Sequence, residues 1–326
     1  MRNELLLEAR NVTRVFRTGL YFGVSFKAVD DVCLSFTRGT PKVLVVAGES
    51  GCGKSTLANM VLGTLRPTRG KILYNSKNIV KLKRKERKAF THDIQPVFQD
   101  PYETFNPFHK VLNYLEATAL NLGIATSQKQ ASEVIDKCLQ RIGVEPKEVY
   151  EKFPHEFSGG QLQRLSIARA LVANPSLLVA DEPVSMVDAS VRVSILNLFA
   201  ELVKQSGISI IYITHDLSTA YYLGAQTGGE IIIMYRGSII EQGLVEKVLT
   251  EPVHPYTKML MEALPEPDTQ KRWKDKVKLP SLEWEEFQAS GCKFAGRCPQ
   301  VMERCKGETP KDISVDDVLV KCFLYS

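Results

Sequence analysis

Residues 47–56 read AGESGCGKST and place three glycines beside one lysine. The pattern G-x-x-x-x-G-K-[ST] is met by Gly48, Gly53, Lys54 and Ser55. Glycine loses more conformational entropy on folding than other residues, so its repetition indicates a place that needs bare backbone. Backbone N–H groups without neighbouring Cβ atoms can converge on a phosphate, and a following helix adds further N–H groups. The stretch therefore predicts a phosphate-binding loop.

Within this loop, Lys54 is expected to reach the outer phosphates of a nucleotide, and Ser55 to offer its hydroxyl to Mg²⁺. Cys52 occupies a variable position, and no role is expected for its side chain. A glycine-rich turn with an unrelated lysine is the alternative. The residues expected to surround the nucleotide are Gly48, Glu49, Ser50, Gly51, Cys52, Gly53, Lys54, Ser55 and Thr56.

Two acidic residues end the apolar run SLLVADE. Asp181 is expected to hold the Mg²⁺ shell, and Glu182 to face the outer phosphate, where it can orient and deprotonate a water molecule. Hydrolysis of a phosphoanhydride depends mostly on positioning and charge neutralisation, which suits a carboxylate close to the metal. Acidic residues are common after strands, so this pair alone is weak evidence for a catalytic site. Together with the phosphate loop it is strong evidence.

Three further features carry weaker signals. Ser158, Gly159, Gly160 and Gln161 begin a helix-patterned segment, which predicts a second anion-binding helix start. This segment has no lysine of its own, so it is expected to complete a site formed elsewhere; an ordinary serine N-cap is the alternative. The other two candidates are His215, for phosphate and water contacts, and Gln99, for Mg²⁺ or water. Both also have ordinary structural explanations.

Apolar runs at 42–48, 176–182 and 208–216 predict buried parallel strands. Ligands bind beyond the carboxyl ends of the strands in open α/β sheets. The residues expected to share that edge are Gly48, Asp181, Glu182 and His215. The stretch at about 108–155 has helical spacing with glycines at two expected helix ends, Gly123 and Gly143, so we expect a helical insert.

The composition describes an ordinary globular chain of 326 residues with a net charge of +5. This charge is too small to indicate a nucleic-acid partner, and the basic run at 81–88 predicts a solvated surface. No apolar run reaches the roughly 18–20 residues of a membrane span. The first residues do not resemble a secretory signal, so we expect a cytoplasmic protein that reaches a membrane only through a partner.

The motifs together resemble the ATP-binding cassette (ABC) ATPase family over residues 12–240. The matching positions are the loop at 48–55, Gln99, the signature at 158–161, Asp181 and Glu182, the D-loop Asp188, and His215. The resemblance implies an α/β P-loop NTPase core with a mixed sheet and an inserted helical subdomain at about 100–172. It also implies ATP and Mg²⁺ as ligands, Ser55, Gln99 and Asp181 around Mg²⁺, and Phe16 stacked on adenine. In this family two ATPase domains pair head to tail, and each signature closes on the partner's ATP.

Three strings resemble the ATPase subunits of dipeptide and oligopeptide importers: VFQDPYETFNP, FPHEFSGGQLQRLSIARAL and HPYTKMLMEALPEP. The resemblance implies an ATPase domain at 1–250 and an importer-type extension at 251–326. The implied partners are a paralogous ATPase subunit, two membrane-spanning permeases and, indirectly, an extracellular solute-binding protein. The implied cargo is peptides or oligosaccharides. The segment SMVD at 185–188 departs from the usual SALD but keeps Asp188.

The extension contains four cysteines, Cys292, Cys298, Cys305 and Cys322, in a C-x5-C-x6-C-x16-C pattern. Similar importer ATPases carry a [4Fe–4S] cluster on such cysteines, so the resemblance implies a cluster here. Zinc, disulfides and unligated thiols are the alternatives. For the whole chain, the rival functions are a soluble ABC ATPase of DNA repair or translation and an exporter cassette.

Overall fold

The protein is described by a computed structural model over residues 4–18, 24–264 and 290–326. Its strands are β1 Leu5–Thr18, β2 Val24–Thr37, β3 Val43–Ala47, β4 Arg69–Tyr74, β5 Lys77–Asn78, β6 Ile94–Val97, β7 Leu177–Asp181, β8 Ser209–Thr214, β9 Glu230–Tyr235, β10 Ser238–Leu244, β11 Ile313–Val315 and β12 Val318–Val320. Its helices are α1 Lys54–Val61, α2 Arg84–Asp93, α3 Pro101–Thr104, α4 Val111–Leu122, α5 Gln128–Arg141, α6 Gly159–Val172, α7 Ala189–Ser206, α8 Leu217–Thr227, α9 Val245–Thr250, α10 Pro255–Glu262 and α11 Glu303–Gly307.

The strands form two sheets. An antiparallel sheet has the order β2-β1-β4-β5, and a mixed sheet has the order β11-β12-β10-β9-β3-β8-β7-β6. In the mixed sheet β3 pairs in parallel with β8, and β8 pairs in parallel with β7. The three predicted buried strands are therefore confirmed, and they lie side by side.

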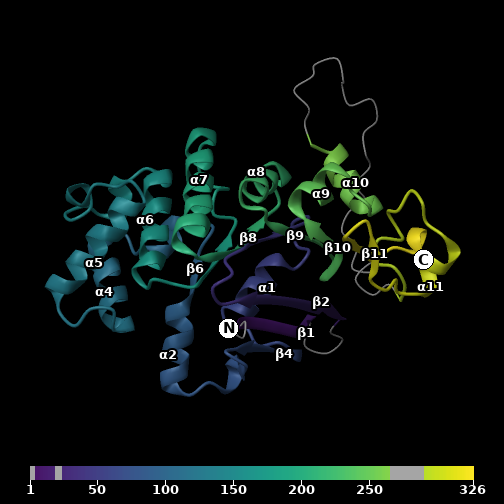
Figure 1. Cartoon of the computed structure of the whole chain (residues 1–326), viewed down its shortest axis with the longest axis horizontal. Helices are drawn as coiled ribbons and strands as arrows, with labels where there is room; N and C mark the ends of the chain where they lie inside the picture. Colours follow the sequence, from purple (N-terminus) through teal and green to yellow (C-terminus); the bar gives the residue numbers. More distant parts are fainter. Residues whose placement is uncertain (1–3, 19–23, 265–289) are drawn as a thin grey trace, which may run out of the picture.

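Strand β3 shows why these runs are apolar at every position. Successive side chains of a strand point to opposite faces of its sheet. Val43, Val45 and Ala47 join the core on the helical side of the sheet. Leu44 and Val46 join a second core, which the mixed sheet shares with α1 and the antiparallel sheet. Figure 1 shows α1 and the small sheet on one side of the large sheet, and α7 and α8 on the other.

The predicted helical insert forms α3 to α6, between β6 and β7. Helices α4, α5 and α6 pack on one another and form the left end of the molecule in Figure 1. The predicted helix ends are confirmed: Gly123 is the C-cap of α4 with φ of 73°, and Gly143 follows α5 with φ of 69°. Both residues adopt the left-handed backbone that glycine tolerates without strain.

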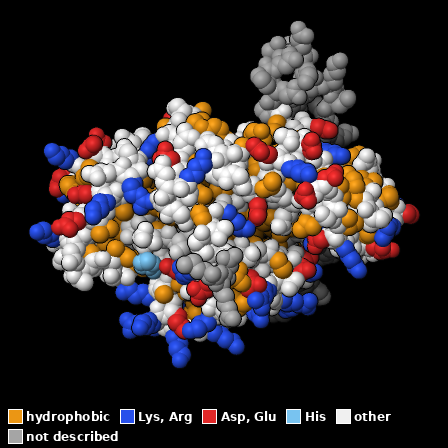
Figure 2. All heavy atoms as spheres, viewed as in Figure 1, with side chains coloured by type: hydrophobic (Ala, Val, Ile, Leu, Met, Phe, Trp, Pro, Cys, Tyr) orange, Lys and Arg blue, Asp and Glu red, His pale blue; other side chains and the backbone are white. Residues whose placement is uncertain are grey.

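The basic run at 81–88 leads into α2, whose Arg84, Lys85 and Lys88 are exposed. Figure 2 shows Lys and Arg side chains gathered along the lower edge of the molecule, where Figure 1 places α2. This exposure confirms the expected solvated surface. Within the described residues, no helix combines the length and apolar character needed to cross a membrane.

The last strands of the chain join the mixed sheet. Strand β12 pairs with β10, and β11 pairs with β12, so residues after 290 extend the same sheet as the phosphate loop's own strand. Phe294 packs edge-on against Tyr235 of β9 and Tyr256 of α10, with ring centroids 5.3 and 5.4 Å apart. The segment 290–326, hereafter the tail, is thus built onto the core. The last three residues of the predicted string at 254–267 lie outside the described residues.

The HPYTK segment is anchored by buried polar contacts. Glu241, fully buried on β10, accepts hydrogen bonds from the backbone N–H groups of Val253 (2.7 Å) and His254 (3.1 Å). The His254 Nδ1 atom in turn accepts a hydrogen bond from the Tyr256 N–H at 3.0 Å and caps α10. An imidazole that accepts at Nδ1 is neutral, and burial lowers the pKa of His254 to about 4. Protonation of His254 therefore opposes the folded arrangement.

This anchor predicts a pH dependence of stability. The unfolded chain binds the His254 proton near pH 6.5, whereas the folded chain binds it only near pH 4. The folded state is therefore disfavoured as the pH falls, and His254 should remove about 2 kcal/mol from the free energy of unfolding between pH 7 and pH 5. The variant His254→Asn keeps a side-chain acceptor for the cap but does not titrate. Denaturant unfolding at both pH values should give a smaller loss for the variant. Parent and variant both contain Glu241. If their free energies of unfolding fall equally between pH 7 and pH 5, His254 does not control this response.

Candidate functional site

The loop between β3 and α1 is shaped by its glycines. Gly48, Gly51 and Gly53 have φ of 148°, 79° and 108°, values that other residues rarely adopt. A Cβ atom at Gly48 would lie 2.2 Å from the Met234 carbonyl oxygen, and one at Gly53 would lie 2.0 Å from the Ala28 carbonyl oxygen. A Cβ atom at Gly51 would meet nothing within 4 Å. Two of the glycines are therefore required by close packing beneath the loop, and Gly51 lies on its open side.

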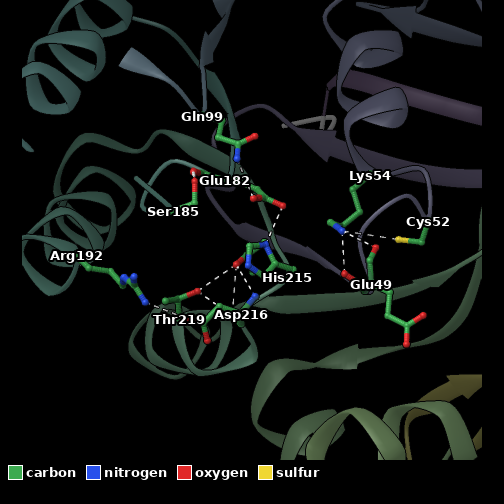
Figure 3. A network of polar contacts seen from close by, with 12 residues as sticks. Glu49, Cys52, Lys54, Gln99, Glu182, Ser185, Arg192, His215, Asp216 and Thr219 are labelled. Carbon is green, nitrogen blue, oxygen red and sulfur yellow. Dashed lines mark hydrogen bonds and ion pairs between the residues drawn. The ribbon is translucent and has the colours of Figure 1, made fainter. Parts of the chain in front are cut away.

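The Lys54 side chain folds back onto the loop and bonds to its backbone. Its buried Nζ donates hydrogen bonds to the carbonyl oxygens of Gly48 at 2.8 Å and Glu49 at 2.9 Å. Figure 3 shows the ammonium group turned back over the loop, while the Glu49 carboxylate points away from it. Carbonyl contacts leave the positive charge without a neutralising partner among these atoms, so it can meet an anion that enters the loop.

Asp181 and Ser55 meet beside the loop. Burial raises the pKa of the Asp181 carboxyl, and the nearby Ser55 hydroxyl opposes part of that rise. The Oδ1 atom of Asp181 is buried and accepts no hydrogen bond in the described structure. Gln99 and Asp181 line the same cavity of about 530 Å³. A carboxylate, a hydroxyl and an amide form the oxygen-rich donor set that Mg²⁺ prefers, so these residues fit that ion.

Glu182 forms the centre of a second polar group. Its carboxylate lies 3.0 Å from His215 Nδ1 and 3.3 Å from Gln99 Nε2, which donates to it (Figure 3). The backbone of Glu182 has φ of 46°, a strained value for a residue with a side chain, and its N–H donates to the Ile213 carbonyl oxygen. That hydrogen bond ties the turn after β7 to strand β8 and fixes the direction of the carboxylate.

The predicted common edge is confirmed. Gly48, Glu182 and His215 directly follow β3, β7 and β8, and Asp181 ends β7, in a sheet where these strands run parallel. Gly48 and Glu182, which are 134 positions apart in the chain, therefore lie at the same edge because the topology brings the strand ends together.

Phe16 lies at another cavity. Its ring is half-buried on β1, with the Phe26 ring 5.8 Å away and the Arg14 guanidinium 4.7 Å from its centroid. These residues line a cavity of about 870 Å³, together with Lys27, Asp30 and Lys293. Phe16 therefore lines this cavity with a cation over its ring and a second aromatic ring beside it.

The second glycine-rich helix start is separate from the phosphate loop. Ser158 caps α6 through a reciprocal capping box, in which its Oγ accepts from the Gln161 N–H and its own N–H donates to Gln161 Oε1. Gly160 packs against Val191 of α7, where a Cβ atom would come within 2.5 Å of the valine. Gly159 lies beside the Met186 carbonyl oxygen, and Asp188 occupies the N-cap position of α7 without a side-chain capping hydrogen bond. These contacts remain between α6 and the start of α7, so within one chain the signature completes no site at the loop.

The four tail cysteines gather without forming a metal site. Burial raises the pKa of the Cys292 thiol to about 11, with further contributions from Cys305, Cys322 and Cys298. All four are free thiols, and Cys305 and Cys322 are buried. Among the described residues, however, no group of three or more His, Cys, Asp or Glu side chains is arranged to hold a metal ion. The predicted [4Fe–4S] cluster therefore lacks support from this geometry.

Two residues that contact the phosphate loop were missed by the sequence analysis. The Tyr256 hydroxyl accepts a hydrogen bond from the Glu49 N–H at 3.0 Å. Arg297 forms two hydrogen bonds of 2.8 Å with the Glu49 carboxylate. Tyr256 belongs to the HPYTK string, which lies outside the ATPase core motifs. This string was the only sequence pattern noted that could have indicated the Tyr256 contact. Arg297 lies between Cys292 and Cys298 in a segment without a recognisable motif of its own.

Comparison with known proteins finds two family models that match different parts of the chain. Residues 29–185 match the family model described as ABC transporter, and residues 240–305 match the model described as oligopeptide/dipeptide transporter, C-terminal region. A probable peptide ABC transporter ATP-binding protein of Sinorhizobium fredii is 39% identical over 89% of this chain and 80% of its own length. A putative oligopeptide transport ATP-binding protein of Bacillus subtilis is 37% identical over 100% of this chain and 97% of its own length.

Solved structures give a similar result. A Clostridium perfringens protein that is part of an ABC transporter complex superposes with a TM-score of 0.63 at 29% identity, over 76% of this chain and 92% of that protein. A dimeric ATP-binding cassette in a post-hydrolysis state, bound to ADP and Pi, superposes with a TM-score of 0.63 at 26% identity. It covers 73% of this chain and 98% of that cassette.

Proposed function

The chain belongs to the ABC transporter ATPases of the oligopeptide/dipeptide family, and from that membership we propose that it is the nucleotide-binding subunit of a peptide importer. The family hydrolyses ATP with Mg²⁺, and this chain is accordingly an ATPase. The observation that carries the proposal is that the Lys54 loop and the hydrogen-bonded group of Glu182, Gln99 and His215 follow strand ends at one edge of the sheet.

We assign the nucleotide contacts as follows. The Phe16 ring stacks on the base at the rim of its cavity. The N–H groups of the loop and the Lys54 ammonium bind the phosphates, with the open side at Gly51 facing them. Ser55, Asp181 and Gln99 hold Mg²⁺, which supplies charge neutralisation at the phosphate oxygens when bound. The unpartnered Oδ1 atom of Asp181 supports this donor set.

The chemical step is assigned to Glu182. Its carboxylate orients a water molecule and accepts a proton as the water oxygen bonds to the γ-phosphorus. The bond from this phosphorus to the β–γ bridging oxygen breaks, and ADP leaves with the electron pair. His215, 3.0 Å from the Glu182 carboxylate, holds that group in place and steadies the γ-phosphate. The strained backbone of Glu182 supports a fixed direction for this base.

The signature is assigned to the partner's nucleotide. Ser158, Gly159 and Gly160 form the capped start of α6, and we assign the N–H groups of this helix start to the ATP of the partner in a head-to-tail dimer. Asp188 at the start of α7 is exposed and available at such a contact. The dimeric relative solved with ADP and Pi supports pairing. We propose that the second subunit is a paralogous ATPase, with two permeases and an external solute-binding protein completing the importer.

Docking to the permeases is assigned to the helical insert. Phe98, Tyr102 and Phe108 expose large apolar side chains near Gln99, with exposed fractions of 42%, 49% and 84%. Such side chains favour a protein partner, and their position beside Gln99 would connect that partner to the Mg²⁺ donors. This assignment places the subunit at the cytoplasmic face of the membrane.

The domain limits of 1–250 and 251–326 are part of the same proposal. No comparison favours a soluble ATPase without a transport partner, since the matched relatives are named as transport proteins.

We propose a [4Fe–4S] cluster on the four tail cysteines from the family resemblance alone, because the described residues form no group arranged to hold a metal ion. Protein purified without oxygen should contain iron and absorb broadly near roughly 400 nm. Cys305→Ser should lose both signals, whereas Cys33→Ser, at an exposed thiol outside the tail, should keep them. Iron-free parent protein under these conditions rules the cluster out.

The central prediction concerns Glu182→Gln. The variant keeps the hydrogen-bonding shape of the side chain but removes the base, so kcat should fall at least about a hundredfold. ATP binding should persist, and ATP should accumulate in a closed dimer, visible by size-exclusion chromatography. Lys54→Ala serves as the contrast, because it should lose ATP binding in calorimetry. Turnover by Glu182→Gln at the parent rate would refute the assigned role of the carboxylate.

A further inference from the structure

Glu49 is held at three points. Its N–H donates to the Tyr256 hydroxyl at 3.0 Å, its carbonyl oxygen accepts from Lys54 Nζ at 2.9 Å, and its carboxylate pairs with Arg297. The first and third contacts come from α10 and from the tail, which lie more than 200 positions away in the chain. The peptide groups at the start of the phosphate loop are thus fixed by residues outside the nucleotide motifs.

Arg297 is built for this contact. Its side chain is only 5% exposed, and its guanidinium lies 5.7 Å from the centroid of Tyr235 and 5.9 Å from that of Phe294. Both terminal nitrogens bond to Glu49 at 2.8 Å in a two-pronged arrangement, the strongest geometry for an arginine and a carboxylate. The bound carboxylate raises the pKa of Arg297 above its usual value. The guanidinium therefore lies between the two aromatic rings and Glu49, and its terminal nitrogens point towards the Glu49 carboxylate.

A second contact from the tail reaches the same loop through a turn. Lys293 Nζ donates to Asp30 Oδ2 and to the Arg236 carbonyl oxygen, both at 2.9 Å. The next residue, Gly237, donates its N–H to the Cys52 carbonyl oxygen and accepts from the Asp30 N–H, both at 2.8 Å. Lys293 also lines the cavity of Phe16. The tail thus supports the loop beneath Cys52 as well as at Glu49.

The pairing of Arg297 with the negative charge of Glu49 should affect how tightly the loop binds ATP. A free carboxylate beside a phosphate loop repels a triphosphate, whereas one that is paired with a buried arginine does not present that charge. Removal of one partner of a buried pair leaves the other uncompensated. Loss of Arg297 should therefore weaken ATP binding through Glu49, beyond any loss of packing in the tail.

We propose that Arg297 and Tyr256 are positioning residues for the nucleotide: they clamp Glu49 so that the phosphate loop keeps its shape and its positive potential. The proposal rests on the proposed nucleotide site. It makes the tail part of the ATP-binding apparatus, because the tail's own fold must be intact for Arg297 to reach the loop.

The experiment compares the full-length parent with Arg297→Ala, Arg297→Ala/Glu49→Gln and the surface control Lys306→Ala, whose partner Glu303 is also exposed. The dissociation constant for Mg·ATP is measured by calorimetry, with KM and kcat for hydrolysis. Arg297→Ala should weaken binding on the order of tenfold and raise KM more than it lowers kcat. The loss should shrink at high salt, where the repulsion is screened. The control should stay within twofold of the parent, as expected for an exposed ion pair.

The double variant decides between clamping and mere structural support. If the unpaired Glu49 charge causes the loss, Arg297→Ala/Glu49→Gln should bind ATP at least about threefold more tightly than Arg297→Ala. A double variant as weak as Arg297→Ala, or an Arg297→Ala that binds like the parent, overturns the proposal. Lys54→Ala separates this failure from failure of the nucleotide site itself: if Lys54→Ala binds ATP like the parent, it is the site assignment that fails.

Discussion

The shape of the loop between β3 and α1 is the constraint on which the rest of the protein depends. A phosphate-binding loop works only if its N–H groups already point inward before the ligand arrives, because ordering them on binding would cost affinity. In this chain the order is imposed from below by packing. Gly48 and Gly53 press against backbone carbonyl oxygens at distances that admit no side chain, and Lys54 draws the loop's own carbonyls together.

The parallel sheet supplies the second half of the site at the same edge. Strand β8 pairs with β3, and β7 pairs with β8, so the acids at the end of β7 and the histidine after β8 lie at the same sheet edge as the loop without any local sequence relation to it. The Glu182 side chain is then aimed by a strained backbone, a bond to β8 and contacts from Gln99 and His215. Precision here comes from strand ends, which are rigid, rather than from flexible loops. Pairing of two ATPase domains, in which the signature of one subunit meets the nucleotide of the other, remains part of the proposed mechanism.

Much of this could be predicted from residue types. The apolar runs predicted the three buried strands, and Gly123 and Gly143 predicted two helix ends. The segment AQTGGE at 225–230 departs from the usual sequence of related importer ATPases; in the structure Gly228 is the C-cap of α8 with φ of 61°, and the Gly229 N–H donates to the Gly224 carbonyl oxygen. The reason for the glycines at 48 and 53 could be predicted only in part, because their contacts with Met234 and Ala28 depend on tertiary packing. The clamp on Glu49 could not be predicted, since a bond between residues 248 positions apart leaves no periodic trace. The cysteine pattern indicated a metal centre that the described geometry does not contain.

The most direct test is a crystal structure of this protein with a non-hydrolysable ATP analogue and Mg²⁺. The account predicts phosphate density inside the loop at residues 48–55, Mg²⁺ on the Ser55 and Asp181 oxygens, and the γ-phosphate facing Glu182 and His215. Nucleotide density at any other place on the protein would contradict it.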